Sequence, residues 1–177
     1  MGVLLILIAI IIIASIIYFS SKGNSSSIPE ITNVSSIRDV VMAVNYGRIY
    51  PFFTRMNLER VKGIVEKSGA DATDFKNSLH LQELIGCVRG VHIPLLNDAL
   101  VSEVYVSFNK NQVVSSITIN ISKIEFSTLV EQMLLKFGKP ISINKQLMVW
   151  RDGYMTISLD STNKYINVMD ETLCLIK

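Results

Sequence analysis

Residues 122–140 read SKIEFSTLVEQMLLKFGKP, and they contain the signals for both ends of a helix. Ser122, followed three positions later by Glu125, matches a capping box. Apolar residues then recur at helical spacing for nearly three turns, at Phe126, Leu129, Val130, Met133, Leu134 and Phe137. Gly138 can adopt the left-handed conformation that ends a helix, and Pro140 prevents its continuation. The stretch therefore predicts an amphipathic helix that packs on an apolar partner.

Strands are predicted on both sides of this helix, because apolar and polar residues alternate there. The alternating segments are residues 103–108, 116–121, 146–151, 154–159 and 165–169. The polar residues between the first two segments predict a hairpin. Asp152-Gly153 is typical of a type I′ hairpin turn and predicts a second one.

Three further helices are predicted ahead of the first hairpin, over residues 37–47, 57–69 and 75–88. Ser36, with Asp39 three positions on, is close to a capping box for the first of them. The order of elements is then ααα-ββ-α-βββ. We expect an α+β fold in residues 37–177, with an antiparallel sheet packed by helices.

The N-terminal segment is the most apolar part of the chain, whose mean hydropathy is +0.39. In Val3–Phe19 the only polar side chain is Ser15, and the first charged side chain is Lys22. Residues 1–21 would form a helix of roughly 31 Å, about the thickness of the hydrocarbon core of a bilayer. The sequence predicts a transmembrane anchor over 1–21, which contacts lipid through residues 3–19.

Two alternatives for this segment are a cleaved signal peptide and a buried helix of a soluble core. The side of the membrane is also open. Lys22 and Arg38 favour a cytoplasmic domain under the positive-inside rule. Residues 22–36 are rich in Ser and Asn and resemble a solvated linker that lifts a domain from a surface. We expect a single-pass protein of the bacterial inner membrane with its domain in the periplasm.

The charge pattern argues against a nucleic-acid partner. The chain has 17 basic and 15 acidic residues, and they are interspersed rather than gathered into a basic stripe. Cys87 and Cys174 are the only cysteines. Outside the cytoplasm they could form a disulfide worth about 4–5 kcal/mol in the chain-entropy model. The alternative is that both are small buried hydrophobic residues.

Catalytic, cofactor and metal motifs are not recognised. Cys87, His80 and His92 lie close together in the sequence, so a membrane-tethered enzyme with Cys87 as nucleophile is the alternative function. The apolar neighbours of Cys87 favour an inert core position. Two cysteines and two histidines so widely spaced do not match a zinc site. The acidic residues Asp152, Asp160, Asp170 and Glu171 are expected in a turn and on a solvated rim.

The helix that ends in Gly-x-Pro at Gly138–Pro140, followed by a strand with Trp150, resembles a pattern of small bacterial envelope proteins. The resemblance covers residues 123–159. It is to the outer-membrane-assembly lipoprotein family (SmpA/OmlA) and the related β-lactamase-inhibitor-protein fold. Members of those families are interaction proteins or inhibitors, which implies a binding role here. This chain differs because it lacks a lipidated Cys and has three preceding helices.

Trp150, Arg151 and Tyr154 are the candidate interaction surface, because these residue types are enriched at binding hot spots and flank the second hairpin turn. Trp150 and Arg151 point to opposite faces, so the alternative is that Trp150 packs in the core. We expect a membrane-anchored, extracytoplasmic protein-interaction module that is not an enzyme. Its partner would be a periplasm-acting toxin, for an immunity or inhibitor protein, or a subunit of an envelope complex.

Overall fold

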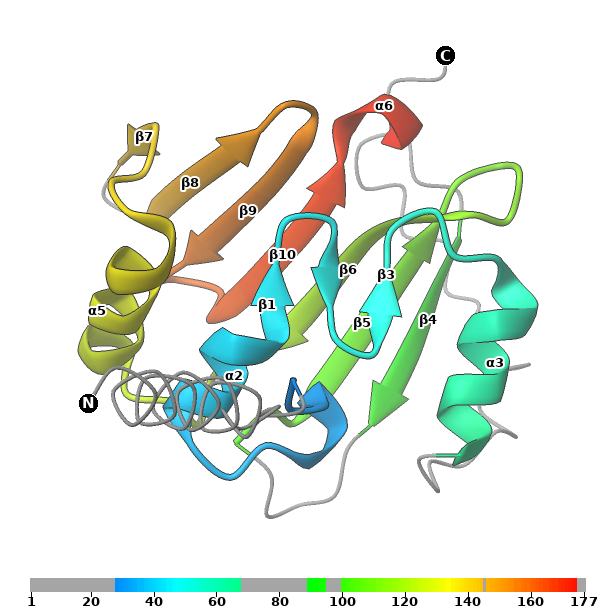
Figure 1. Cartoon of the computed structure of the whole chain (residues 1–177), viewed down its shortest axis with the longest axis horizontal. Helices are drawn as coiled ribbons and strands as arrows, with labels where there is room; N and C mark the ends of the chain where they lie inside the picture. The colour runs from blue at the N-terminus through cyan, green and yellow to red at the C-terminus, as the bar shows by residue number, and fades with distance from the viewer. Residues whose placement is uncertain (1–27, 68–88, 95–99, 145, 175–177) are drawn as a thin grey trace, which may run out of the picture.

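The computed structural model describes residues 28–67, 89–94, 100–144 and 146–174 of the 177-residue chain (Figure 1). The helical elements in this part are η1 (Ile31–Asn33), α2 (Ile37–Ala43), α3 (Leu58–Lys67), α5 (Phe126–Phe137) and α6 (Glu171–Cys174). Three short strands, β1 (Val44–Asn45), β2 (Arg48–Ile49) and β3 (Phe52–Phe53), form one antiparallel sheet. The strands of the large sheet are β4 (Arg89–Pro94), β5 (Glu103–Phe108), β6 (Val114–Asn120), β7 (Ser142–Ile143), β8 (Leu147–Asp152), β9 (Met155–Asp160) and β10 (Tyr165–Asp170).

The large sheet runs in the order β4-β5-β6-β10-β9-β8-β7, and all neighbouring strands are antiparallel. The last strand in the sequence, β10, is therefore the middle strand of the sheet. It joins β6 on one side to β9 on the other. Each of the two flanking groups consists of strands that are consecutive in the sequence.

The core is built from rows of apolar residues that face one another across the strands. One buried row consists of Ile93, Val104, Ile119, Ile166 and Leu159. On the other face, Tyr105, Thr118, Asn167 and Ser158 form a polar row. The Thr118 hydroxyl donates to the Asn167 side-chain oxygen at 3.0 Å within it. One face of the sheet is therefore the core face, as is common for antiparallel sheets.

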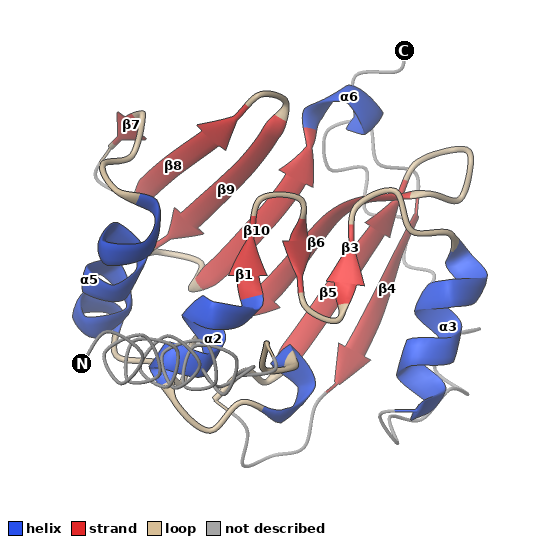
Figure 2. Ribbon diagram, in the orientation of Figure 1, coloured by secondary structure: helices blue, strands red, loops and turns tan. Residues whose placement is uncertain are grey.

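The second layer covers the core face with α2, α5 and the β1–β3 sheet (Figure 2). Main-chain hydrogen bonds tie the segment after β3 to β6. The Arg55 N–H donates to the Val114 carbonyl at 2.7 Å, and the Val114 N–H donates to the Met56 carbonyl at 2.8 Å. Helices α5 and α3 lie at opposite ends of the sheet, beside β7 and β4 respectively (Figure 1).

Both hairpins, the strand after them and the amphipathic helix are confirmed, and so is the α+β class. The capping box at Ser36 and Asp39 is also confirmed. At α5 the capping box is wrong, because Glu125 is the N-cap residue and its carboxylate accepts from the hydroxyls of Ser127 and Thr128 instead.

The second hairpin turn is displaced by one residue from the prediction. Asp152 pairs with Met155, so the two central residues are Gly153 and Tyr154. Gly153 has φ of 58°. A glycine at the first central position is the pattern of a type II′ turn rather than I′.

The predicted order of elements is wrong in several places, and it also lacks the short elements β7 and α6. Helix α2 ends at Ala43, and the chain then forms β1–β3 instead of more helix. Strand β4 was not predicted at all. Ile31 and Val34, which were placed in the linker, are buried in the core. The third predicted helix, over 75–88, lies outside the described residues.

The predicted fold also began with a transmembrane helix, and the structure does not bear out this part of the prediction. Within the described ranges, no helix combines the length and the apolar character needed to cross a bilayer. Residues 1–21, to which that helix was assigned, lie outside these ranges.

Candidate functional site

Trp150 is a core residue, so the predicted surface of Trp150, Arg151 and Tyr154 does not form as one patch. Its side chain is 1% exposed. The indole N–H donates to the Gly138 carbonyl at 2.9 Å, and the ring centroid lies 6.3 Å from that of Phe137. Trp150 therefore fastens the end of α5 to β8.

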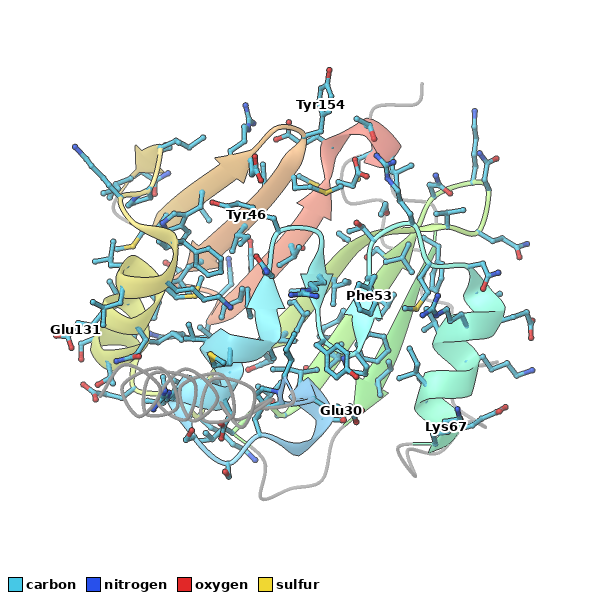
Figure 3. All side chains as sticks on the ribbon, viewed as in Figure 1. Glu30, Tyr46, Phe53, Lys67, Glu131 and Tyr154 are labelled. Atoms are coloured by element: carbon cyan, nitrogen blue, oxygen red, sulfur yellow. The ribbon has the colours of Figure 1, made fainter. Side chains whose placement is uncertain are left out.

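Arg151 and Tyr154 are both exposed, but they are engaged differently. The Arg151 guanidinium forms an ion pair of 2.5 Å with Glu171 of α6. Tyr154 is 66% exposed and projects away from the β8–β9 turn (Figure 3). A binding role for these two residues stays a prediction.

The cysteine and histidine predictions rest mainly on residues outside the described ranges. Cys174 is buried in α6, whereas Cys87 and His80 are not described, so their pairing or catalytic role stays a prediction. His92 lies in β4, opposite Tyr105 of β5. Among the described residues, no three His, Cys, Asp or Glu side chains are grouped so that they could hold a metal ion.

Asp160 and Asp170 are buried, contrary to the expectation that they lie on a solvated rim. Asp160 is the last residue of β9 and accepts from the main-chain N–H groups of Thr162 and Asn163, both at 2.8 Å. Burial acts to raise the pKa of Asp160, but these hydrogen bonds outweigh it and leave the pKa below its usual value. Asp160 is therefore a turn-forming residue.

Asp170 is fully buried and links three parts of the chain. One oxygen accepts from the Thr172 N–H at 3.0 Å and from its hydroxyl, and the other accepts from Arg55 Nε at 2.8 Å. Burial again acts to raise the pKa, and the hydrogen bonds from Thr172 and Arg55 lower it below the usual value. Asp170 thus stays ionised and holds Arg55 in place.

Four exposed apolar side chains lie on the last part of α5 and on the segment that leads through β7, and we call this region the apolar end. Its members are Leu134, Leu135, Ile141 and Ile143. Leu135 is 79% exposed, Ile141 is 62% exposed and Ile143 is 59% exposed. Such large apolar side chains are usually isolated on a protein surface, whereas these four fall within ten residues of the chain.

The apolar end is an extension of the core. The row through Leu159 continues to Met148 of β8 and then to Ile143 of β7. Residues that pair across neighbouring strands share a face of the sheet, so Ile143 lies on the core face. The second layer does not cover it there. Glu131 and Lys139 are exposed polar residues near this surface.

Sequence reasoning missed this surface for an identifiable reason. Leu134 was assigned to the buried stripe of the helix, and the alternation Ile141-Ser142-Ile143 was not read as a strand. The available signal was the pair Ile141 and Ile143, two positions apart directly after Pro140, which is typical of a short strand.

The fold and surface define a small α+β protein with an antiparallel sheet and an uncovered apolar end. The chain belongs to the TP0088 domain family, whose model matches residues 51–174. No curated protein matches the chain.

Two solved structures show a distant likeness. A DUF4309 family protein (YjgB) from Bacillus subtilis subsp. subtilis str. 168 is 11% identical, with a TM-score of 0.36 over 83% of this chain and 99% of that one. The C-terminal domain of TagH is 11% identical, with a TM-score of 0.28 over 72% of this chain and 68% of that one.

Proposed function

We propose that the chain is a non-enzymatic protein-interaction module that acts on the extracytoplasmic side of a bacterial inner membrane. It binds its protein partner through the apolar end. The partner is either a toxin, which the chain neutralises as an immunity or inhibitor protein, or a subunit of an envelope complex. The location is inferred from the sequence alone, and the lipid contact predicted for residues 3–19 lies outside the described residues.

The observation that carries the proposal is the exposure of Leu135, Ile141 and Ile143 at one end of the sheet. Burial of a Leu or Ile side chain gains about 1.5–3 kcal/mol relative to leaving it exposed. Binding of a partner that covers all three side chains is therefore stabilised by the burial free energy of each of them. The polar residues Glu131 and Lys139 nearby match the polar rim that surrounds the apolar centre of many interfaces.

The roles of the buried carboxylates also support a binding module. Asp160 organises a turn, and Asp170 positions Arg55 and begins α6. Each has structural partners that account for its burial and its lowered pKa. Neither is a carboxyl with a raised pKa, which a general acid near neutral pH would need.

The proposal is tested by site-specific photo-crosslinking in cells. A photoreactive residue replaces Leu135 or Ile143 in the full chain, and the matched control replaces Glu66, which is exposed on α3 at the opposite end of the sheet (Figure 1). We expect the first two positions to give one discrete adduct with a protein of fixed mass, and the control to give much less. Absence of an adduct at both positions, or equal yields at all three, would contradict the apolar end as the contact surface.

A second experiment separates the two classes of partner. Cells with and without the gene are challenged with the crosslinked protein expressed from a controlled promoter. A toxin is expected to kill only the cells that lack the chain. A complex subunit is expected to be harmless and to become unstable when the chain is missing.

A further inference from the structure

Two arginines line one hollow of the surface, at the end of the sheet away from α5 and β7. The hollow has a volume of about 270 Å³ and is lined by Phe53, Thr54, Arg55, Met56 and Arg60. Figure 3 labels Phe53 on β3, beside the start of α3. Pockets for whole small molecules or cofactors usually occupy about 300–1,000 Å³. The volume of this hollow is close to the lower end of that range, so the hollow suits a small ligand.

Arg55 is held in an unfavourable backbone conformation by bonds to distant parts of the chain. Its φ is 69°, which costs a residue with a side chain roughly 1–2 kcal/mol. The main-chain bond to Val114 and the ion pair with Asp170 offset this cost. The ion pair uses only Nε, so the two terminal nitrogens retain four N–H donors. Because the side chain is 62% exposed, these donors can reach a ligand.

Arg60 is also placed against a local preference. Asn57 accepts from the Arg60 N–H at 3.0 Å and so caps α3, which puts Arg60 in the first turn of the helix. The first turn carries the positive end of the helix dipole, where cations are disfavoured by about 0.3–1 kcal/mol. Glu59 in the same turn compensates in part.

Residues in unfavourable backbone conformations or in disfavoured helix positions are found more often at functional sites. Arg55 and Arg60 are two such residues, and both line the hollow. We propose that the hollow is a binding site for an oxyanion, either a carboxylate or a phosphate, which Arg55 and Arg60 hold together. A guanidinium presents paired N–H groups that match both anions in bidentate geometry. Asp170 neutralises one of the two arginines and already uses both oxygens, for Arg55 and Thr172. The site keeps a net positive charge against the apolar side chains of Phe53 and Met56.

This site is distinct from the apolar end, since the hollow adjoins β3 and α3 at the opposite end of the sheet (Figure 1). A protein that docks through the apolar end leaves the hollow open. The oxyanion is either a free small anion or the acidic group of a larger ligand.

The test is calorimetric titration of the purified full chain with inorganic phosphate and, separately, with glutarate, at constant ionic strength. The decisive variant is Arg60→Gln, because Arg60 has an exposed side chain. The matched control is Arg38→Gln, an exposed arginine of α2 with the same charge change. We expect saturable binding at one site, weakened about tenfold or more by R60Q and unchanged by R38Q, as for loss of a charge-assisted hydrogen bond.

The tighter of the two probes identifies the oxyanion. Arg60→Lys should restore binding only in part, because an ammonium lacks the planar pair of donors. Arg55→Gln should also abolish binding, and circular dichroism shows whether it stays folded. The proposal is overturned if neither probe saturates, or if R38Q weakens binding as much as R60Q.

Discussion

The ammonium group of Lys136 on α5 donates a hydrogen bond of 2.7 Å to the main-chain carbonyl of Val41, ninety-five residues earlier in the chain. It also donates to the carbonyls of Met42 and Val44. These carbonyls lie at the C-terminal end of α2, where a helix has no partners of its own for them. Lys136 therefore caps α2 and fastens the two helices together.

Replacing Lys136 with Met should lower the free energy of unfolding by about 1–3 kcal/mol, because carbonyls at the end of α2 lose a charged donor. Urea denaturation at neutral pH measures the change. Lys139→Met, at an exposed neighbouring position, is the control and should change stability by less than about 0.5 kcal/mol. Equal effects of the two substitutions would refute the capping role.

Replacing Asp170 with Asn should destabilise the fold by about 1–3 kcal/mol, because the charge-assisted bonds from Arg55 and Thr172 are weakened in a fully buried place. Asp152→Asn, in an exposed position next to the β8–β9 turn, should be nearly neutral. Thermal unfolding compares the two. A D170N protein as stable as the parent would mean that the ion pair contributes nothing to stability.

The acid limb of stability should depend on Asp160 and Asp170. Both have folded-state pKa values below the usual 3.8, so the unfolded chain binds more protons than the folded chain near that pH. Their contribution is present above about pH 4 and is lost as the pH falls through the folded-state values. Urea denaturation from pH 6 to pH 2 should show this loss, and D170N should show a shallower one. If the free energy of unfolding fell equally steeply with pH in D170N and in the parent protein, Asp170 would not contribute to the acid sensitivity.

Two glycines should respond to alanine with opposite signs. Gly138, at the end of α5, has φ of 71° and ψ of −156°, a region almost restricted to glycine. Gly138→Ala should therefore cost about 1–3 kcal/mol through the backbone alone, since no atom lies within 4 Å of the added methyl. Gly63→Ala, inside α3 with equally open surroundings, should stabilise by about 0.5–1 kcal/mol. Chemical denaturation checks both values.

The hairpins and α5 could be predicted because their signals are local. In β5, for example, Val104, Val106 and Phe108 alternate with more exposed residues, and Gly138 ends the helix just before Pro140. The α5 stripe also includes Leu134, which the structure leaves exposed. Periodicity identifies an apolar face but not whether another element covers it.

The β1–β3 sheet could not be predicted from periodicity. Its strands are two residues long, which is too short for any alternation to appear. These strands are stabilised by main-chain hydrogen bonds, such as the bond of 2.9 Å that the Tyr50 N–H donates to the Ala43 carbonyl. Strand β4 was missed because Gly90 and Pro94 at its ends look like helix-ending and loop residues.

The residues that line the hollow lie close together in the sequence, but the carboxylate that holds Arg55 in place is distant. Arg55 and Asp170 are separated by 115 positions, and no local pattern connects them. Asp170 looked like a solvated residue because it precedes Glu171 in a polar run. Only the pairing of β10 with β6 and β9 places this carboxyl in the interior.

The central position of β10 has a consequence for synthesis on the ribosome. Strands β4–β6 and β7–β9 emerge first, and each group can pair only with itself, as a small sheet that is marginal in water. Strand β10 emerges after both groups, and only it can bridge them into one continuous sheet. Until residues 165–170 have emerged, the nascent protein therefore has two half-sheets with open edges, which are prone to aggregation and to proteolysis.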